Sequence, residues 1–175
     1  MWKSGGVLLR DRTDDDLAGC VELARVVHER DGYPHHLRAD LRDFLVRPDA
    51  YGVWVAERDR RIVGHVALRQ RTAPAPMDLA SAATGRPANE LGVISRLLVA
   101  PAARRDGIGR RLLAHGSQQA VSRGLWPVLD VAADLTGAIR LYESCGWVRA
   151  GAVTVTFRDG NSLDELVYLG PPLGR

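Results

Sequence analysis

The chain has 175 residues, of which 46% are hydrophobic and 26% charged, as is usual for a globular domain with a sizeable core. Its 24 Lys and Arg residues face 21 Asp and Glu residues, and the basic residues are dispersed, which does not favour a nucleic-acid partner. No apolar run approaches the roughly 18 residues of a membrane span, and two cysteines make no disulfide framework, so we expect one domain, residues 1–175, in the cytoplasm without membrane contact.

Residues 7–34 predict a strand followed by a helix. Residues 7–10 fit a short strand, and Thr13 with Asp16 three residues later forms a partial capping box. Apolar residues then recur at helical spacing. Because Gly32 and Pro34 interrupt this pattern, we expect the helix to end just before them.

A second helix and a hairpin come next. Residues 38–46 carry apolar side chains on one side and stop before Pro48, which predicts a short helix. The runs 51–56 and 62–68 are rich in β-branched and aromatic residues and are joined by a charged segment that includes residues 58–61, which predicts a hairpin. His65 lies among apolar neighbours in the second strand, where a core or edge role is more common than that of a base.

Residues 71–89 are rich in Pro, Ala and Ser and show no clear period, so we expect an extended loop. Loops longer than about 12–15 residues inside compact domains are usually functional or disordered. We therefore expect this segment to act as a lid over a binding site.

The strongest local signal is a glycine turn between a strand and a helix. The apolar run 91–99 predicts a buried strand, and residues 108–123 predict a helix that Gly124 ends. Between them, Gly107 and Gly109 lack Cβ, so the backbone can adopt positive φ and approach a ligand, with unpaired N–H groups at the first helical turn. Such a turn favours an anion. Four basic residues add charge around it: Arg104, Arg105, Arg110 and Arg111.

The rest of the chain adds another strand and helix and then a hairpin. Residues 127–131 predict a strand, and a helix containing Tyr142 follows. Residues 148–157 and 163–169 alternate in polarity on either side of residues 158–161, which predicts a second hairpin. No repeat or second domain is indicated.

Two other phosphate loops have similar glycines. A P-loop requires Gly-Lys-Ser/Thr, but Arg110 follows Gly109, so this reading is excluded. A dinucleotide site requires a third glycine where Leu112 stands and a turn directly after the strand. Asp130 does lie about 20 residues further on, where a ribose-binding acid would be, and the dinucleotide site therefore stays open as the weaker alternative.

Two segments resemble those of a known family. Arg104-x-x-Gly107-x-Gly109 resembles the pyrophosphate loop, Gln/Arg-x-x-Gly-x-Gly/Ala, of the GNAT superfamily of acyl-CoA-dependent N-acetyltransferases. The segment from Ala138 to Trp147, which includes Leu141-Tyr142, resembles the family's Ala-x-x-Leu-Tyr-x-x-x-Gly-Phe segment at the expected distance. The resemblance implies an α/β (α+β) GNAT-like fold whose central mixed, mostly antiparallel sheet is flanked by helices and splays where strands end near residues 99 and 131.

The resemblance also implies the reaction and the cofactor site. An acetyl group would move from acetyl-CoA, as co-substrate, to a primary amine by direct attack, without a metal. The main chain of Leu98 and Val99 would bind the pantetheine arm, and a nearby backbone N–H would stabilise the oxyanion. The pyrophosphate would bind at Arg104, Arg105, Asp106, Gly107, Ile108, Gly109 and Arg110.

The resemblance identifies the proton donor of the reaction but not the base. Tyr142 matches the tyrosine whose phenol lies near the CoA sulfur, and a protonated phenol can donate to the leaving thiolate. Family members often carry a carboxylate or histidine where Val93 and Ser95 stand. We therefore expect Glu90 to act as base, directly or through water, with Ser95 positioning a water as the alternative. A further departure is Leu135, which replaces a pantetheine-binding asparagine.

The acceptor is not readable from the sequence. In the family, the helical region after the first helix forms one wall of the acceptor site. By position only, this implies four residues that would contact the acceptor: Tyr33, His35, His36 and Phe44. The two histidines lack a third ligand at zinc spacing, and we expect Cys145 to be buried rather than nucleophilic. The sequence leaves a homodimer open.

Two other functions are alternatives to an enzyme. A CoA-binding sensor without turnover is favoured by Val93, which cannot accept a proton, and thioester hydrolysis with and without amines would separate it from an enzyme. A nucleic-acid binder would show a salt-dependent affinity.

Overall fold

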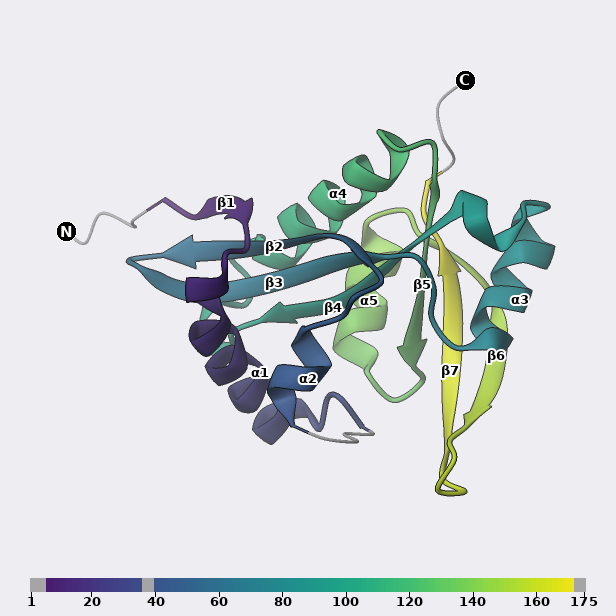
Figure 1. The fold of residues 1–175 in the computed structure, drawn as a ribbon, viewed down its shortest axis with the longest axis horizontal. Coiled ribbons are helices and arrows are strands. Elements are labelled where there is room, and N and C mark those ends of the chain that lie inside the picture. Colours follow the sequence, from purple (N-terminus) through teal and green to yellow (C-terminus); the bar gives the residue numbers. More distant parts are fainter. Residues whose placement is uncertain (1–5, 36–39, 172–175) are drawn as a thin grey trace. The chain divides into compact units, whose positions relative to one another are not determined.

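The computed structural model describes residues 6–35 and 40–171 and contains one mixed sheet with helices beside it (Figure 1). The strands are β1 (Leu8–Asp11), β2 (Ala50–Arg58), β3 (Arg61–Arg69), β4 (Leu91–Val99), β5 (Trp126–Ala132), β6 (Val148–Thr156) and β7 (Ser162–Leu169). The helices are α1 (Leu17–Asp31), α2 (Leu41–Leu45), α3 (Pro74–Thr84), α4 (Ile108–Val121) and α5 (Thr136–Ser144).

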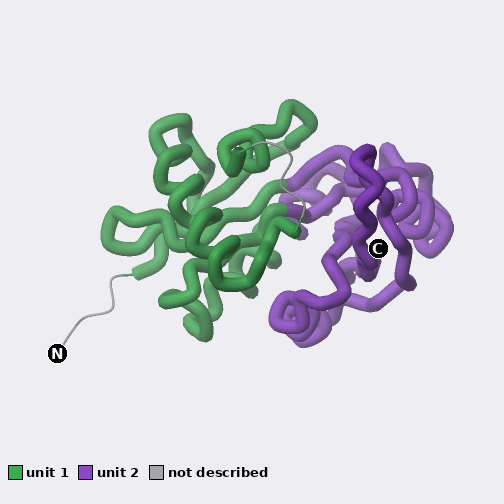
Figure 2. The backbone as a smooth tube through the Cα atoms, turned by 90° about the horizontal axis from the view of Figure 1, so that it is seen from below, with its two compact units in different colours: residues 1–67, 96–115 green, residues 68–95, 116–175 purple. Residues whose placement is uncertain are grey.

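The strand order is β1-β2-β3-β4-β5-β7-β6. β4 and β5 are parallel, whereas β1 with β2, β5 with β7 and β6 with β7 are antiparallel. The expected mixed, mostly antiparallel sheet is confirmed. The chain divides into two compact units (Figure 2): unit 1 comprises Met1–Ala67 and Arg96–His115, and unit 2 comprises Leu68–Ser95 and Gly116–Arg175. That residues 1–175 form one domain stays a prediction.

Unit 1 has helices on both faces of its strands. Because side chains alternate along a strand, Trp54 and Val55 of β2 point to opposite faces. Trp54 contacts His115 of α4, with the ring centroids 5.0 Å apart. On the other face, side chains of α1 and α2 form a core cluster with β2 and β4: Leu17, Cys20, Leu23, Ala24, Val27, Leu45, Val55 and Leu98.

Unit 2 is organised around β5 and β7. The β4–β5 ladder runs from Leu91↔Trp126 to Val93↔Val128. Among the described residues of unit 2, the β4–β5 pairing ends at Val93 and Val128, although both strands continue beyond these residues. This is what a splayed pair of strands predicts. Tyr168 of β7 contacts Tyr142 of α5, 6.1 Å between ring centroids. The face opposite Tyr168 carries α3 in a core cluster: Met77, Ala80, Leu91, Val93, Val128 and Val167.

The extended loop expected at residues 71–89 is wrong, because α3 occupies most of it. Pro74 is the first residue of α3, where its fixed φ suits a helix and its missing N–H costs nothing. The alanines that follow favour a helix, and Gly85 ends it at a φ of +67°. The prolines therefore mark a helix start here rather than an irregular segment. The second helix expected over residues 38–46 is confined to α2, and residues 36–39 lie outside the described part of the chain.

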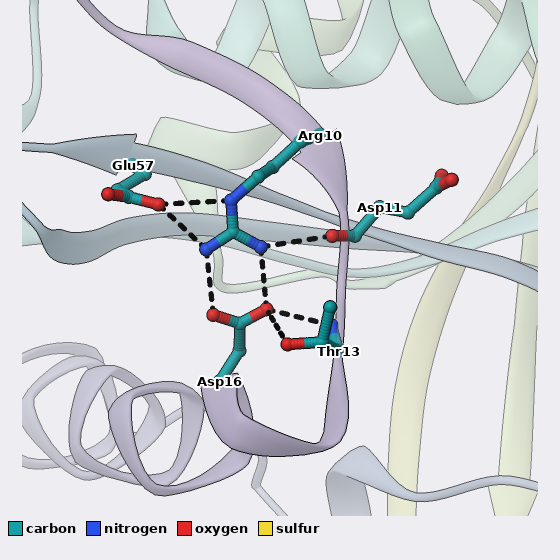
Figure 3. Close-up of polar contacts among 5 residues, drawn as sticks. All are labelled: Arg10, Asp11, Thr13, Asp16 and Glu57. Carbon is teal, nitrogen blue, oxygen red and sulfur yellow. Dashed lines mark hydrogen bonds and ion pairs between the residues drawn. The ribbon is translucent and has the colours of Figure 1, made fainter.

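Arg10 links three segments at the start of unit 1 (Figure 3). Its guanidinium donates to both Asp16 carboxylate oxygens, at 2.7 and 2.8 Å, and to Glu57 Oε2 at 2.7 and 3.0 Å. The Thr13 N–H also donates to Asp16, at 2.7 Å, which confirms the capping interaction expected before α1. The Arg10 hydrogen bonds hold the pKa of Asp16 well below its ordinary value, so the ionised carboxylate stabilises the fold.

We predict that Asp16→Asn lowers the free energy of unfolding at pH 7 by about 1–2 kcal/mol, because Arg10 and Thr13 lose a charged acceptor. The stabilisation by Asp16 is present above the carboxyl pKa of the unfolded chain, about 3.9, and is lost as the pH falls through the lower folded value. The difference from wild type should therefore shrink below about pH 5. Urea denaturation at pH 7 and pH 4 measures it. Asp15→Asn, on an exposed neighbour, is the control, and an equal effect of both variants would contradict the account.

Candidate active site

The loop before α4 presents a row of backbone donors in unit 1. Arg105 and Gly107 both have left-handed backbones, with φ of +71° and +76°, and α4 begins at Ile108. Among the described residues, no hydrogen bond to a backbone acceptor starts from the amides of residues 105–109, whereas the Arg111 amide donates to Gly107 O at 3.1 Å. Successive amides of this kind, with the positive helix end beside them, make an anion site.

Only one of the two expected left-handed glycines has that conformation. Gly107 does, and a Cβ built on it meets no atom within 4 Å, so backbone strain rather than crowding selects glycine there. Gly109 instead lies in the first turn of α4. The second left-handed residue is Arg105, which the sequence did not reveal because a non-glycine rarely adopts this φ.

The arginines of the loop have different roles. Arg104 forms an ion pair with both carboxylate oxygens of Asp31, at the end of α1, and its Nε donates to Val99 O at 3.3 Å. Arg111 donates to Val7 O at 3.1 Å. Asp106 pairs with Arg58 of β2 at 2.8 Å. The expected cluster of charge is therefore partly used to fix the loop to α1, β2 and β4.

The end of β4 offers its main chain rather than its side chains. Leu98 is buried in the cluster under α1, and Val99 is half-buried with its carbonyl bonded by Arg104. Two residues before Leu98, Arg96 has a φ of +51°. A left-handed residue inside a strand departs from the extended backbone, and we refer to this point as the Arg96 bulge; such irregularities are common beside functional sites.

Tyr142 lies in α5 of unit 2 and is nearly buried. Its ring contacts those of Trp147 and Tyr168, with centroids 6.3 and 6.1 Å away. The hydroxyl of Tyr168 donates to Glu143 at 2.7 Å. Cys145, just past α5, is half-buried and forms no disulfide.

Of the two expected base candidates, both in unit 2, Glu90 lies just before β4 and Ser95 lies within it. Glu90 is exposed and pairs with Arg86 at 3.2 Å. Ser95 lies about 13 Å along the strand from Leu91 and is half-buried. Ser95 and Val93 share a face by alternation, and Val93 belongs to the cluster under α3.

A pair of carboxyl groups was missed as a candidate. Asp130 of β5 and Glu165 of β7 are diagonal neighbours, since Asp130 pairs with Val167 and Ala132 with Glu165. Both are half-buried and close enough to interact, and Thr72 donates to Asp130 at 3.1 Å. Glu165 Oε2 is buried, with no hydrogen-bond partner among the described residues.

Burial and mutual repulsion keep a proton on this pair. Burial raises the pKa of Asp130, and burial together with the Asp130 charge raises that of Glu165 to about 8. Glu165 therefore retains its proton near neutral pH, and the two carboxyl groups titrate as a unit. Asp130 lies on the same face as Val128, the partner of Val93, so the pair and Ser95 share one face of the sheet in unit 2. The sequence suggested Asp130 only as a ribose ligand, because 35 residues separate it from Glu165.

Three of the four residues expected to contact the acceptor lie in the described part of the chain. Phe44 of α2 contacts Tyr33 edge-on, with centroids 5.7 Å apart. His35 is exposed, and His36 lies outside the described residues. Within residues 6–35 and 40–171, no group of three His, Cys, Asp or Glu side chains could hold a metal ion. None of the helices described there is long and apolar enough to cross a membrane.

Comparison with known proteins gives a family match. The model of the Acetyltransferase (GNAT) family matches residues 19–147. No curated protein matches the chain.

Solved structures with this fold cover nearly the whole chain. A ribosomal-protein-alanine N-acetyltransferase from Brucella melitensis is 24% identical, with a TM-score of 0.68 over 94% of this chain and 99% of that one. Arabidopsis thaliana NAA60, in complex with acetyl-CoA, is 19% identical, with a TM-score of 0.68 over 94% and 97%. The Escherichia coli ribosomal-protein-S18-alanine N-acetyltransferase is 18% identical, with a TM-score of 0.65 over 95% and 94%.

Proposed function

The chain belongs to the GNAT acetyltransferase family, and from that premise we propose that it transfers an acetyl group from acetyl-CoA to a primary amine by direct attack. No covalent enzyme intermediate is required. The observation that carries the proposal is the row of unpaired amides at residues 105–109, at the start of α4.

These amides fit a cofactor phosphate. Five consecutive amides without a backbone acceptor among the described residues are costly unless water or an anion satisfies them, and the pyrophosphate of CoA supplies several acceptor oxygens. The residues of the proposed phosphate site are Arg105, Asp106, Gly107, Ile108, Gly109 and Arg110. Arg104 supports this loop through Asp31. The backbone of Leu98 and Val99 is the proposed contact for the pantetheine arm.

The reaction balances as follows. The neutral amine nitrogen attacks the thioester carbonyl carbon, the N–C bond forms, and the C–S bond breaks. The nitrogen gives up a proton to a base, and the departing sulfur takes one from an acid. We assign the acid to Tyr142, whose phenol is protonated at neutral pH.

For the base we favour the Asp130–Glu165 pair. Both carboxyl groups are half-buried, and a raised pKa makes a carboxylate a stronger proton acceptor near neutral pH. Ser95 shares this face and would position a water. Glu90 remains the alternative base. It is exposed and forms an ion pair with Arg86, as a surface acid would.

The acceptor class is a primary amine. Two of the similar structures are named for acetylating the alanine of a ribosomal protein, so peptides with an N-terminal alanine belong in an acceptor panel with small amines. The competing function is a CoA-binding sensor, which Val93 in place of a carboxylate favours. A sensor would bind CoA and show no amine-dependent thiol release.

We predict that Gly107→Val weakens CoA binding by about 100-fold or more, because valine resists a φ of +76° and its side chain covers the amides. Isothermal calorimetry with CoA measures it. Gly85→Val is the matched control, since Gly85 has a φ of +67° with no atom within 4 Å of a built Cβ. Equal CoA affinity in folded Gly107→Val and wild type would place the phosphate elsewhere.

We predict that Tyr142→Phe lowers the turnover number by about 10² to 10⁴, the usual effect of losing a positioned general acid. The affinity for CoA should stay within about threefold, because the ring and its packing remain. Tyr168→Phe is the control, since it removes a neighbouring buried hydroxyl that bonds Glu143. Turnover of Tyr142→Phe within twofold of wild type would mean that the thiolate leaves without this proton.

We predict that Asp130→Asn lowers the rate of amine-dependent thiol release at pH 7 about 100-fold and that Glu90→Gln lowers it far less. The loss in Asp130→Asn should shrink as the pH rises, because more of the amine is then already neutral. A pH–rate profile from pH 6 to 10 for both variants measures this. A larger loss in Glu90→Gln would identify Glu90 as the base instead.

A further inference from the structure

Arg96 is an irregular point in β4. Its φ of +51° is uncommon for a residue with a long side chain. A backbone outlier of this kind persists only where its surroundings enforce it. In the sequence it stands between Ser95 and the Leu98–Val99 segment, which the proposed function assigns to the pantetheine arm. What holds Arg96 in this conformation therefore also fixes the β4 main chain beside the proposed chemistry.

His65 supplies one of the constraints on Arg96. Its imidazole is fully buried, and Nδ1 lies 2.8 Å from Arg96 O. A carbonyl oxygen can only accept, so Nδ1 must carry the proton. Nε2 lies 3.5 Å from Arg12 Nη1, a donor, and is therefore the unprotonated nitrogen. The neighbours of His65 thus select one neutral tautomer.

The Arg96 side chain supplies the second constraint. Its Nε donates to Phe44 O near the end of α2, and its guanidinium lies 4.7 Å from the centre of the Phe44 ring. Arg12 donates to the next carbonyl, Leu45 O, at 3.1 Å. Two arginines in contact with His65 therefore bind the last two carbonyls of α2, where a cation is favoured by the helix dipole. His65, the Arg96 bulge and α2 form one connected polar network within unit 1.

The sequence interpretation of His65 as a core histidine is confirmed, but its contacts give it a second role. We propose that His65 is a positioning residue of acetyl transfer: its Nδ1–H holds the Arg96 bulge and, through Arg96, fixes both the β4 main chain offered to the thioester and the Phe44 side of the acceptor site. This inference rests on the proposed function.

The charged groups that face His65 are Arg12, after β1, and Arg96 on β4. Burial first, and then these two positive charges, lower its pKa to about 4. The imidazole therefore stays neutral across the pH range in which an amine is acetylated. A proton on Nε2 would face the Arg12 guanidinium.

Two substitutions separate positioning from simple packing. Asn places its side-chain N–H close to the position of His Nδ1, so His65→Asn retains a donor to Arg96 O. His65→Leu fills the space and has no donor. Amine-dependent thiol release is measured with acetyl-CoA at a temperature where circular dichroism shows both variants fully folded, together with calorimetric CoA affinity.

We expect the turnover number of His65→Leu to fall about tenfold or more with a CoA affinity within about threefold of wild type, and His65→Asn to recover most of the turnover. If His65→Leu turns over within twofold of wild type, or if His65→Asn is no better than His65→Leu, the positioning role is wrong while the proposed function stands. If wild type binds CoA and transfers no acetyl group to any amine, the proposed function fails and the inference fails with it.

Discussion

The amides of residues 105–109, which have no backbone acceptor among the described residues, are the constraint on which the loop before α4 in unit 1 depends. A backbone N–H without an acceptor is tolerated only where water or a ligand satisfies it. The surroundings of the loop serve to keep these donors together. Arg104 is bound to Asp31 and to Val99 O, Asp106 to Arg58, and Gly107 supplies the left-handed turn that begins α4. The charges of the loop thus hold its shape, while neutral main-chain groups are left for the ligand.

Unit 2 carries a different constraint, the burial of two carboxyl groups on one sheet face. Ionising both carboxyl groups of diagonal neighbours would place two negative charges close together at a high cost in free energy. The Asp130–Glu165 pair therefore retains a proton at neutral pH. The positive charge of Arg69 acts on Asp130 and lowers its pKa, whereas Glu165 Oε2 is buried without a hydrogen-bond partner among the described residues. Perturbed carboxyl pairs are more often found where a proton is exchanged, which is why this pair is the proposed base.

The sequence predicts most of the fold but not the side-chain contacts between strands. Strand β4 and the start of α4 were predicted to the residue, since an apolar run and a glycine turn are local signals. The segment containing α3 was misread because Pro74 favours a helix start as much as it breaks one. The Asp130–Glu165 pair and the His65–Arg96 contact could not be predicted, because each joins residues on different strands through the sheet register. A left-handed arginine such as Arg96 has no signature in composition or period.

Amide hydrogen exchange at residues 105–109, followed by nuclear magnetic resonance with and without CoA, tests the central claim most directly. The account predicts that these amides exchange fast in the free protein and become protected by CoA, and that pantetheine, which lacks the pyrophosphate, leaves them unprotected. Protection by CoA that is confined to other segments, with unchanged exchange at residues 105–109, would contradict it.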